Sequence, residues 1–141
     1  MKILFILFIL STNALAMDRW TALAMLESGG NDHAIGRAGE VSRYQISPGL
    51  WPGGNPLDAD VALSNAQHIM TSRTAAFEKS HGRAPDDFEF YVLWNAPAQI
   101  NHPHRIVAER ARRFANLMES QTMQRAIYLP QSLRVAIPNP V

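Results

Sequence analysis

The 141-residue chain contains no cysteine. It therefore has no disulfide bond, no thiol nucleophile and no cysteine to which a lipid anchor could be attached. It also lacks an excess of charge of one sign, because 12 basic and 12 acidic side chains remain once the first sixteen residues are set aside. This balance argues against a nucleic acid or an anionic membrane as the partner. The stability of the fold has to come from packing.

The first sixteen residues have the pattern of a secretory signal peptide. Lys2 gives a positive start, residues 3–10 are apolar, and Ala14-Leu15-Ala16 is a small-x-small cleavage site. The apolar run is shorter than the roughly 20 residues that span a bilayer. We therefore expect residues 1–16 to be removed and the protein to be secreted to the periplasm or beyond, free of the membrane. An uncleaved membrane anchor is the alternative.

Apolar residues with helical spacing dominate the rest of the chain, and beta-type alternation is scarce. The helices that we expect follow Asp18 up to Ser28, run from Asp58 to a cap at Gly82, start at Pro85-Asp86-Asp87, and start near Pro103. Between them, four glycines in residues 29–40 predict a tight loop, and residues 41–46 a short extended segment. The sequence thus predicts an all-α, monomeric single domain over residues 17–129, followed by an extended or disordered tail over 130–141.

Glu27 is the residue that this helical pattern does not explain. It falls on the apolar stripe of the first helix with Trp20, Leu23 and Ala24, and that helix is apolar nearly all round. Glutamate is rarely buried unless it is paired or functional, and burial favours its protonated form. At the mouth of a cleft, such a carboxyl group can donate its proton to a leaving oxygen. The alternative is that Glu27 points to solvent or pairs with an arginine.

The residues around Glu27 resemble the signature of the soluble lytic transglycosylase family. Glu27-Ser28 is followed by an alanine seven residues after the glutamate, a glycine twelve after it and a glutamine eighteen after it, which are Ala34, Gly39 and Gln45 in Gln45-Ile46-x-Pro48. Farther on, Leu93-Trp94-Asn95-Ala96-Pro97 resembles the family's Ala-Tyr-Asn-Ala-Gly segment, which lines the opposite wall of the sugar groove. The resemblance covers roughly residues 20–117. It implies a lysozyme-like fold with a catalytic helix and a glycine-rich loop.

Loop residues depart from the family pattern. Gly30, Asp32, Gly36, Ser42 and Tyr44 replace the family's phenylalanine, proline, serine, glycine and methionine, and Pro97 stands where the asparagine segment ends in glycine. These changes reshape sugar subsites more than they affect the acid. They leave chitin oligosaccharides open as alternative substrates.

By this resemblance, the protein cleaves the β-1,4 bond between N-acetylmuramic acid and N-acetylglucosamine in peptidoglycan strands, without a cofactor. Glu27 would first act as the acid and then as the base that removes the proton of the muramoyl 6-hydroxyl group, which closes a 1,6-anhydro ring. The expected substrate-binding residues are Ser28, Glu40, Tyr44, Gln45, Trp94 and Asn95. Tyr91 is a further candidate for stacking on a sugar, although aromatic residues at helical spacing are more often part of a core.

Two other functions stay open. An inverting hydrolase needs a second carboxylate to activate water, and Glu40 stands where goose-type lysozymes carry an acid, so a goose-type-like lysozyme is the first alternative. Glu40 alternatively caps a turn or pairs with Arg37 or Arg43. The second alternative is a glycan-binding protein without turnover.

Other catalytic classes have little support in the sequence. His102-Pro103-His104 matches no helical ligand pattern, and there is no His-Glu-x-x-His motif, so no metal site is predicted. Gly-x-Ser-x-Gly is absent as well. Arg110, Arg112 and Arg113 are interpreted as a solvated face of the last helix.

Overall fold

The structure, a computed structural model, describes residues 18–128, with side chains up to residue 123. Its helices are α1 (Arg19–Ser28), α2 (Ala59–His81), α3 (Asp87–Asn95) and α4 (Arg105–Tyr128), together with the short 3-10 helices η1 (Pro48–Leu50) and η2 (Pro97–Gln99). The prediction of an all-α fold is confirmed. The predicted signal peptide and the predicted tail lie outside the described residues.

The ends of the helices follow the sequence signals closely. The carboxylate of Asp18 accepts a hydrogen bond from the Thr21 backbone N–H at 2.7 Å, and that of Asp58 accepts one from the Asp60 N–H at 2.9 Å. Asp86 and Glu89 form a reciprocal capping box at the start of α3. Gly82 ends α2, as predicted. The fourth helix begins at Arg105, two residues later than Pro103 suggested.

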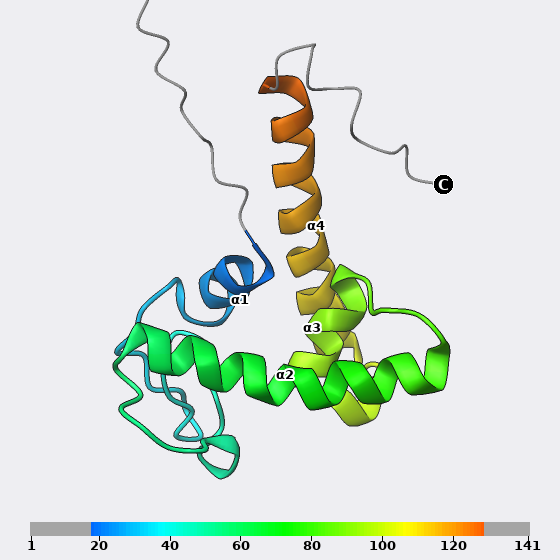
Figure 1. The fold of residues 1–141 in the computed structure, drawn as a ribbon. Helices are drawn as coiled ribbons and strands as arrows, with labels where there is room; N and C mark the ends of the chain where they lie inside the picture. The colour runs from blue at the N-terminus through cyan, green and yellow to red at the C-terminus, as the bar shows by residue number, and fades with distance from the viewer. Residues whose placement is uncertain (1–17, 129–141) are drawn as a thin grey trace, which may run out of the picture.

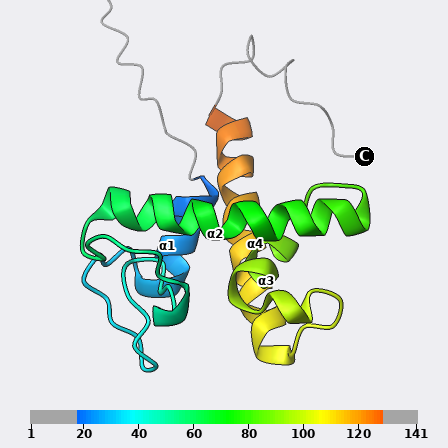
Figure 2. The same ribbon diagram turned by 60° about the horizontal axis from the view of Figure 1, so that its bottom comes forward.

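The helices cross at steep angles. Figures 1 and 2 show α2 running across the molecule, α3 packed beside the first half of α4, and α4 rising steeply away from α2. The loop between α1 and α2 lies beside the N-terminal half of α2 in both views. This arrangement brings α1, the loop, α3 and α4 together around one region.

The core draws on every long helix. Its buried members are Ala22, Leu23, Ala24, Tyr44, Ile46, Ala62, Ala66, Ile69, Met70, Phe77, Phe90, Tyr91, Val92, Leu93, Trp94, Ala111 and Phe114. Five consecutive residues of α3 are buried, whereas α1 leaves Met25 half exposed. The sequence of α1 is apolar nearly all round, yet α3 is the more enclosed helix. Ile106 and Ala76 are exposed, although both fall at apolar positions with helical spacing.

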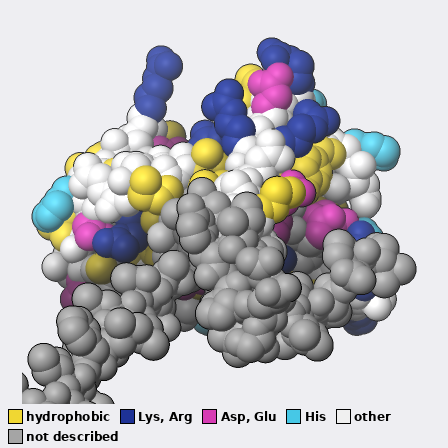
Figure 3. Space-filling view, turned by 90° about the horizontal axis from the view of Figure 1, so that it is seen from above, with side chains coloured by type: hydrophobic (Ala, Val, Ile, Leu, Met, Phe, Trp, Pro, Cys, Tyr) yellow, Lys and Arg dark blue, Asp and Glu magenta, His cyan; other side chains and the backbone are white. Residues whose placement is uncertain are grey.

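The face of the molecule seen in Figure 3 carries side chains of several types. The face in Figure 3 mixes basic, acidic and apolar side chains, and the apolar ones stand in small separate groups. Among the residues that the structure describes, no helix combines the length and the apolar character needed to cross a membrane.

The loop after α1 is closed by hydrogen bonds within itself. Val41 and Ile46 exchange two backbone hydrogen bonds of 2.9 Å, and Val41 also forms a bridge with Ile35. These are isolated bridges, so the short extended segment expected at 41–46 is a tight turn. Arg43 and Asp32 form an ion pair across the loop, with Nη2 of Arg43 2.7 Å from a carboxylate oxygen. The loop can therefore hold side chains in place without a sheet behind it.

Candidate active site

Glu27 lies in the last turn of α1, and its side chain is only 6% exposed. The helix ends immediately after it because Gly29 adopts a left-handed conformation, with φ of 69°, which glycine takes without steric cost. The small exposed part of Glu27 faces a cleft of about 340 Å³. A carboxyl group is thus enclosed on its protein side and open toward a space that a ligand can enter.

Two donors hold the carboxyl group of Glu27. The Tyr91 hydroxyl group donates to Oε1 at 2.6 Å, and Nη2 of Arg110 donates to Oε2 at 2.8 Å. Tyr91 comes from the buried middle of α3 and Arg110 from α4, so three helices meet at this one group. The guanidinium group of Arg110 also lies over the Tyr91 ring, 5.8 Å from its centroid. Such contacts fix the direction of the carboxyl group.

The surroundings of Glu27 act on its pKa in opposite directions. Burial raises the pKa above the ordinary value of 4.5, and the negative charge of Glu40 adds to this effect, while the Tyr91 hydroxyl group and Arg110 lower it. Burial outweighs the two donors, and the net pKa is raised. Burial also raises the pKa of Tyr91 far above 10.0, so its hydroxyl group keeps its proton and is the donor.

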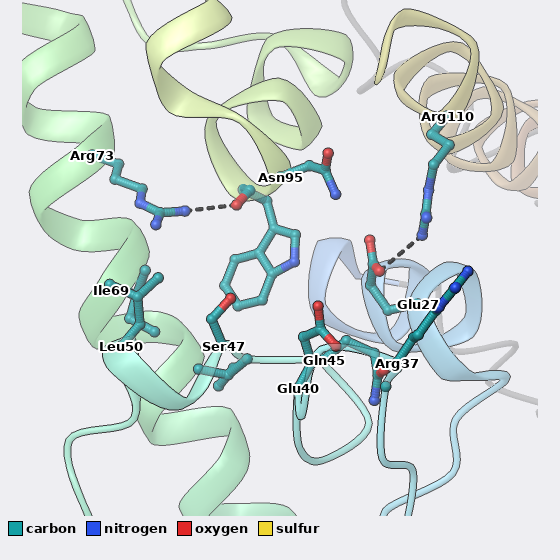
Figure 4. Close-up of a pocket in the computed structure, with 13 residues that line it drawn as sticks. Glu27, Arg37, Glu40, Gln45, Ser47, Leu50, Ile69, Arg73, Asn95 and Arg110 are labelled. Carbon is teal, nitrogen blue, oxygen red and sulfur yellow. Dashed lines mark hydrogen bonds and ion pairs between the residues drawn. The ribbon is translucent and has the colours of Figure 1, made fainter. Parts of the chain in front are cut away.

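The cleft is formed by all the long helices and by the loop between α1 and α2. Its lining residues are Glu27, Gly36, Arg37, Glu40, Gln45, Ile46, Ser47, Leu50, Ile69, Arg73, Trp94, Asn95 and Arg110. Figure 4 shows Glu27, Arg37 and Arg110 at one end of this space, Arg73 at the other, and Asn95 on the wall formed by the end of α3. The lining is mostly polar, so it offers a ligand many hydrogen-bonding groups.

Gly36 allows two acceptors to come together at the cleft. A Cβ atom at this residue would lie 2.2 Å from Oε2 of Glu40 and 2.6 Å from Oε1 of Gln45. The amide nitrogen of Gln45 donates to the carbonyl oxygens of Ala34 and Ser42, at 3.3 Å and 3.0 Å. Oε1 of Gln45 therefore stays free to accept, and Glu40, whose Oε2 accepts from the Ala38 N–H at 2.9 Å, lies beside it.

The residues that the sequence singled out are only partly brought together. Glu27, Glu40, Gln45, Trp94 and Asn95 all line the cleft, with Trp94 almost wholly buried and Asn95 exposed. Ser28 and Tyr44 are not among the lining residues.

Ser28 and Tyr44 have structural contacts instead. The Ser28 hydroxyl group donates to the carbonyl oxygens of Ala24 and Arg43 and accepts from the Asn31 N–H at 3.1 Å, which ties α1 to the loop. Tyr44 is 3% exposed and packs edge-on against Trp20 and Trp94. Neither side chain is free to reach a ligand in this conformation.

Arg110 was missed, because it was assigned to a solvated cluster with Arg112 and Arg113. Those two are exposed, but Arg110 is half-buried and pairs with Glu27. Its spacing contained the signal, since it falls three residues after Val107 and four before Phe114, on the apolar stripe of α4. Like Glu27, Arg110 is a charged residue on the apolar stripe of a helix.

Arg73 was also missed. It lies on α2, and its Nη1 donates to the carbonyl oxygens of Leu93 at 2.8 Å and Trp94 at 2.6 Å. Burial lowers its pKa, although an arginine stays charged at any working pH. Arg73 satisfies the last carbonyl groups of α3 and so holds the wall that carries Trp94 and Asn95. No sequence pattern distinguishes it from other helical arginines.

Within residues 18–128, no group of three or more histidine, aspartate or glutamate side chains is close enough together to hold a metal ion. Comparisons of the chain with protein-family models, with characterised proteins and with solved structures give no match. The function is therefore inferred from the residues of the cleft and from the motif around Glu27.

Proposed function

We propose that the protein is a peptidoglycan lytic transglycosylase, which cleaves the β-1,4 bond between N-acetylmuramic acid and N-acetylglucosamine and leaves 1,6-anhydro ends. The observation that carries this proposal is the Glu27 carboxyl group, 6% exposed, held by two donors and facing a polar cleft. The spacing from Glu27 to Gln45 and the asparagine segment at Asn95 support it, since both ends of that motif line the same cleft.

The chemistry that we infer uses one carboxyl group twice. Protonated Glu27 gives its proton to the bridging oxygen, and the cation-like sugar is stabilised by its own acetamido group. Tyr91 and Arg110 then stabilise the carboxylate that remains. As a base, this carboxylate takes the proton of the muramoyl 6-hydroxyl group, whose oxygen attacks C1 and closes the anhydro ring. The proton balance of Glu27 is restored without water.

The test is digestion of purified sacculi by the protein and by the Glu27→Gln variant. Loss of a general acid costs typically 100-fold to 10,000-fold in rate, and we expect release of anhydro-muropeptides to fall by at least that much. Glu119→Gln is the matched control, because it makes the same chemical change at an exposed residue of α4. Undiminished release by the Glu27→Gln variant would contradict the proposal.

A second candidate function is hydrolysis of the same bond by a goose-type-like lysozyme. It is favoured by one observation, that Glu40 lines the cleft together with Glu27. Mass spectrometry separates the two reactions, because an anhydro product is one water lighter than a hydrolysed one. If water is the nucleophile, products carry the reducing end, and Glu40→Gln suppresses them.

A further inference from the structure

The charged side chains that line the cleft do not balance. Three arginines, at positions 37, 73 and 110, face two glutamates, Glu27 and Glu40. Arg73 is bound to two backbone carbonyl groups, and Arg110 donates to Glu27. Arg37 is exposed and takes part in none of the ion pairs among the described side chains. The cleft therefore offers positive charge that the protein does not neutralise.

Two of the three arginines lie at the Glu27 end of the cleft, where Glu40 is also close enough to raise the pKa of Glu27. Positive charge is therefore in excess at this end once Glu27 is protonated. Arg37 comes from the loop after α1 and Arg110 from α4, and Figure 4 shows both at the Glu27 end of the cleft, away from Arg73. Arg110 uses Nη2 for Glu27, and a guanidinium group has five N–H donors. Two guanidinium groups that line one pocket suit the planar, bidentate geometry of a carboxylate.

Protonation of Glu27 makes the binding of an anion at this end of the cleft more favourable. When Glu27 holds the proton that a general acid needs, Arg110 loses its charged partner, and Glu40 is the carboxylate left among the residues that line the cleft. A carboxylate from a ligand can then form an ion pair with Arg110 in place of Glu27. Its own charge, placed close to Glu27, favours the protonated form of the acid. Binding of the anion and protonation of Glu27 therefore favour each other.

We propose that Arg37 and Arg110 form a subsite for a carboxylate carried by the muramoyl substituent, which makes the cleft selective for peptidoglycan strands over neutral N-acetylglucosamine polymers. The identity of the glycan in this inference rests on the proposed function. The carboxylate comes either from the lactyl group itself, in strands without peptides, or from the stem peptide attached to it. A polymer of N-acetylglucosamine offers neither group.

Binding measurements test the subsite apart from turnover. The Glu27→Gln variant stands in for the protonated acid, and calorimetry compares three four-sugar probes: chitotetraose, the peptide-free tetrasaccharide of alternating N-acetylglucosamine and N-acetylmuramic acid, and the same tetrasaccharide with stem peptides. We expect the charged probes to bind about fivefold more tightly than chitotetraose at low salt, with the preference shrinking as salt screens the charges. Whichever of the two charged probes binds more tightly shows whether the carboxylate comes from the lactyl group or from the stem peptide.

Adding Arg37→Gln to the Glu27→Gln protein should remove most of this preference. Arg112→Gln is the matched control, because it removes the same charge from an exposed residue that does not line the cleft. An unchanged preference in the Arg37→Gln protein overturns the inference. Preference for the charged probes without cleavage of sacculi by the unmodified protein overturns the proposed function and leaves the subsite standing. If none of the probes binds, the inferred subsite is overturned, and release of anhydro-muropeptides by the unmodified protein decides the proposed function separately.

Discussion

The hydrogen bond between Tyr91 and Glu27 gives the sharpest test of how the carboxyl group is held. Tyr91→Phe removes one hydroxyl group, and its 2.6 Å bond to Oε1 of Glu27 is that group's contact with the site. The ring stays in place, because Tyr91 is fully buried against Phe114 and its other core neighbours. The change therefore reports on this bond with little effect on packing.

The magnitude depends on the protonation state of Glu27. A hydrogen bond to a charged group contributes about 1.5–3 kcal/mol, and one between neutral groups about 0.5–1.5 kcal/mol. Glu27 is 6% exposed and Tyr91 is fully buried, so water cannot replace the lost donor. We expect Tyr91→Phe to lower the free energy of unfolding by about 2 kcal/mol when Glu27 is ionised and by about 1 kcal/mol when it is protonated.

The sign of the pH dependence follows from the raised pKa of Glu27. Because the folded-state pKa lies above the ordinary 4.5, this group stabilises the folded state most below that value, and the contribution is lost as pH rises through the folded-state pKa. Removing the Tyr91 hydroxyl group raises the folded-state pKa of Glu27 further, so the variant loses more stability than the unmodified protein as pH rises. The stability gap between the two proteins therefore widens as pH rises.

Urea unfolding at about pH 4, which is below the raised pKa of Glu27, and again at about pH 8 measures the difference in stability between the two proteins at each pH. Tyr44→Phe is the control, because Tyr44 is also buried and its hydroxyl group donates to no carboxylate among the described side chains. The stability loss caused by Tyr44→Phe should therefore change less with pH. Equal gaps for Tyr91→Phe at the two pH values would refute the assignment of this bond to an ionising carboxyl group.

Three further changes test other parts of the site. Arg110→Gln removes a positive charge that lowers the pKa of Glu27, so the basic limb of the profile of kcat/KM against pH should move to higher pH, and a shift to lower pH would contradict the assignment. Gly36→Ala introduces a Cβ atom that displaces the Glu40 and Gln45 side chains, so activity on sacculi should fall about tenfold to 100-fold with little change in urea unfolding. Arg73→Gln removes two hydrogen bonds at the end of α3 and should lower the free energy of unfolding by about 1–3 kcal/mol; unchanged stability would show that those bonds contribute nothing.

The helices were predictable because their signals are local. Asp18, Asp58 and Asp86 precede apolar runs with helical spacing, and the backbone N–H groups that each one caps lie within three residues. The extent to which each helix is buried was less predictable. The burial of five consecutive residues of α3 depends on its packing against α2 and α4, and nothing within its nine residues specifies those neighbours.

The site was predictable where one residue broke a pattern. Glu27 stood out on an apolar stripe, and the motif led from it to Gln45 and Asn95, which share its cleft. The contacts of Ser28 and Tyr91 were not predictable, because they join segments separated by 15 and 64 residues in the sequence. Ser28 is next to Glu27 in the sequence, yet its hydroxyl group donates to the loop. The hydroxyl group of Tyr91, far along the chain, donates to Glu27.

The ion pair between Glu27 and Arg110 fits two roles, and their consequences differ. A purely structural pair stabilises the fold, so its loss lowers stability and leaves the pH profile of any activity unmoved. An acid that later acts as a base needs neither form strongly favoured, and burial on one side against Tyr91 and Arg110 on the other provides that balance. Under this second role, Arg110→Gln favours the protonated form, so proton donation continues at higher pH while the return step slows. A stability loss accompanied by a shifted profile therefore supports the catalytic role, and a stability loss alone supports the structural one.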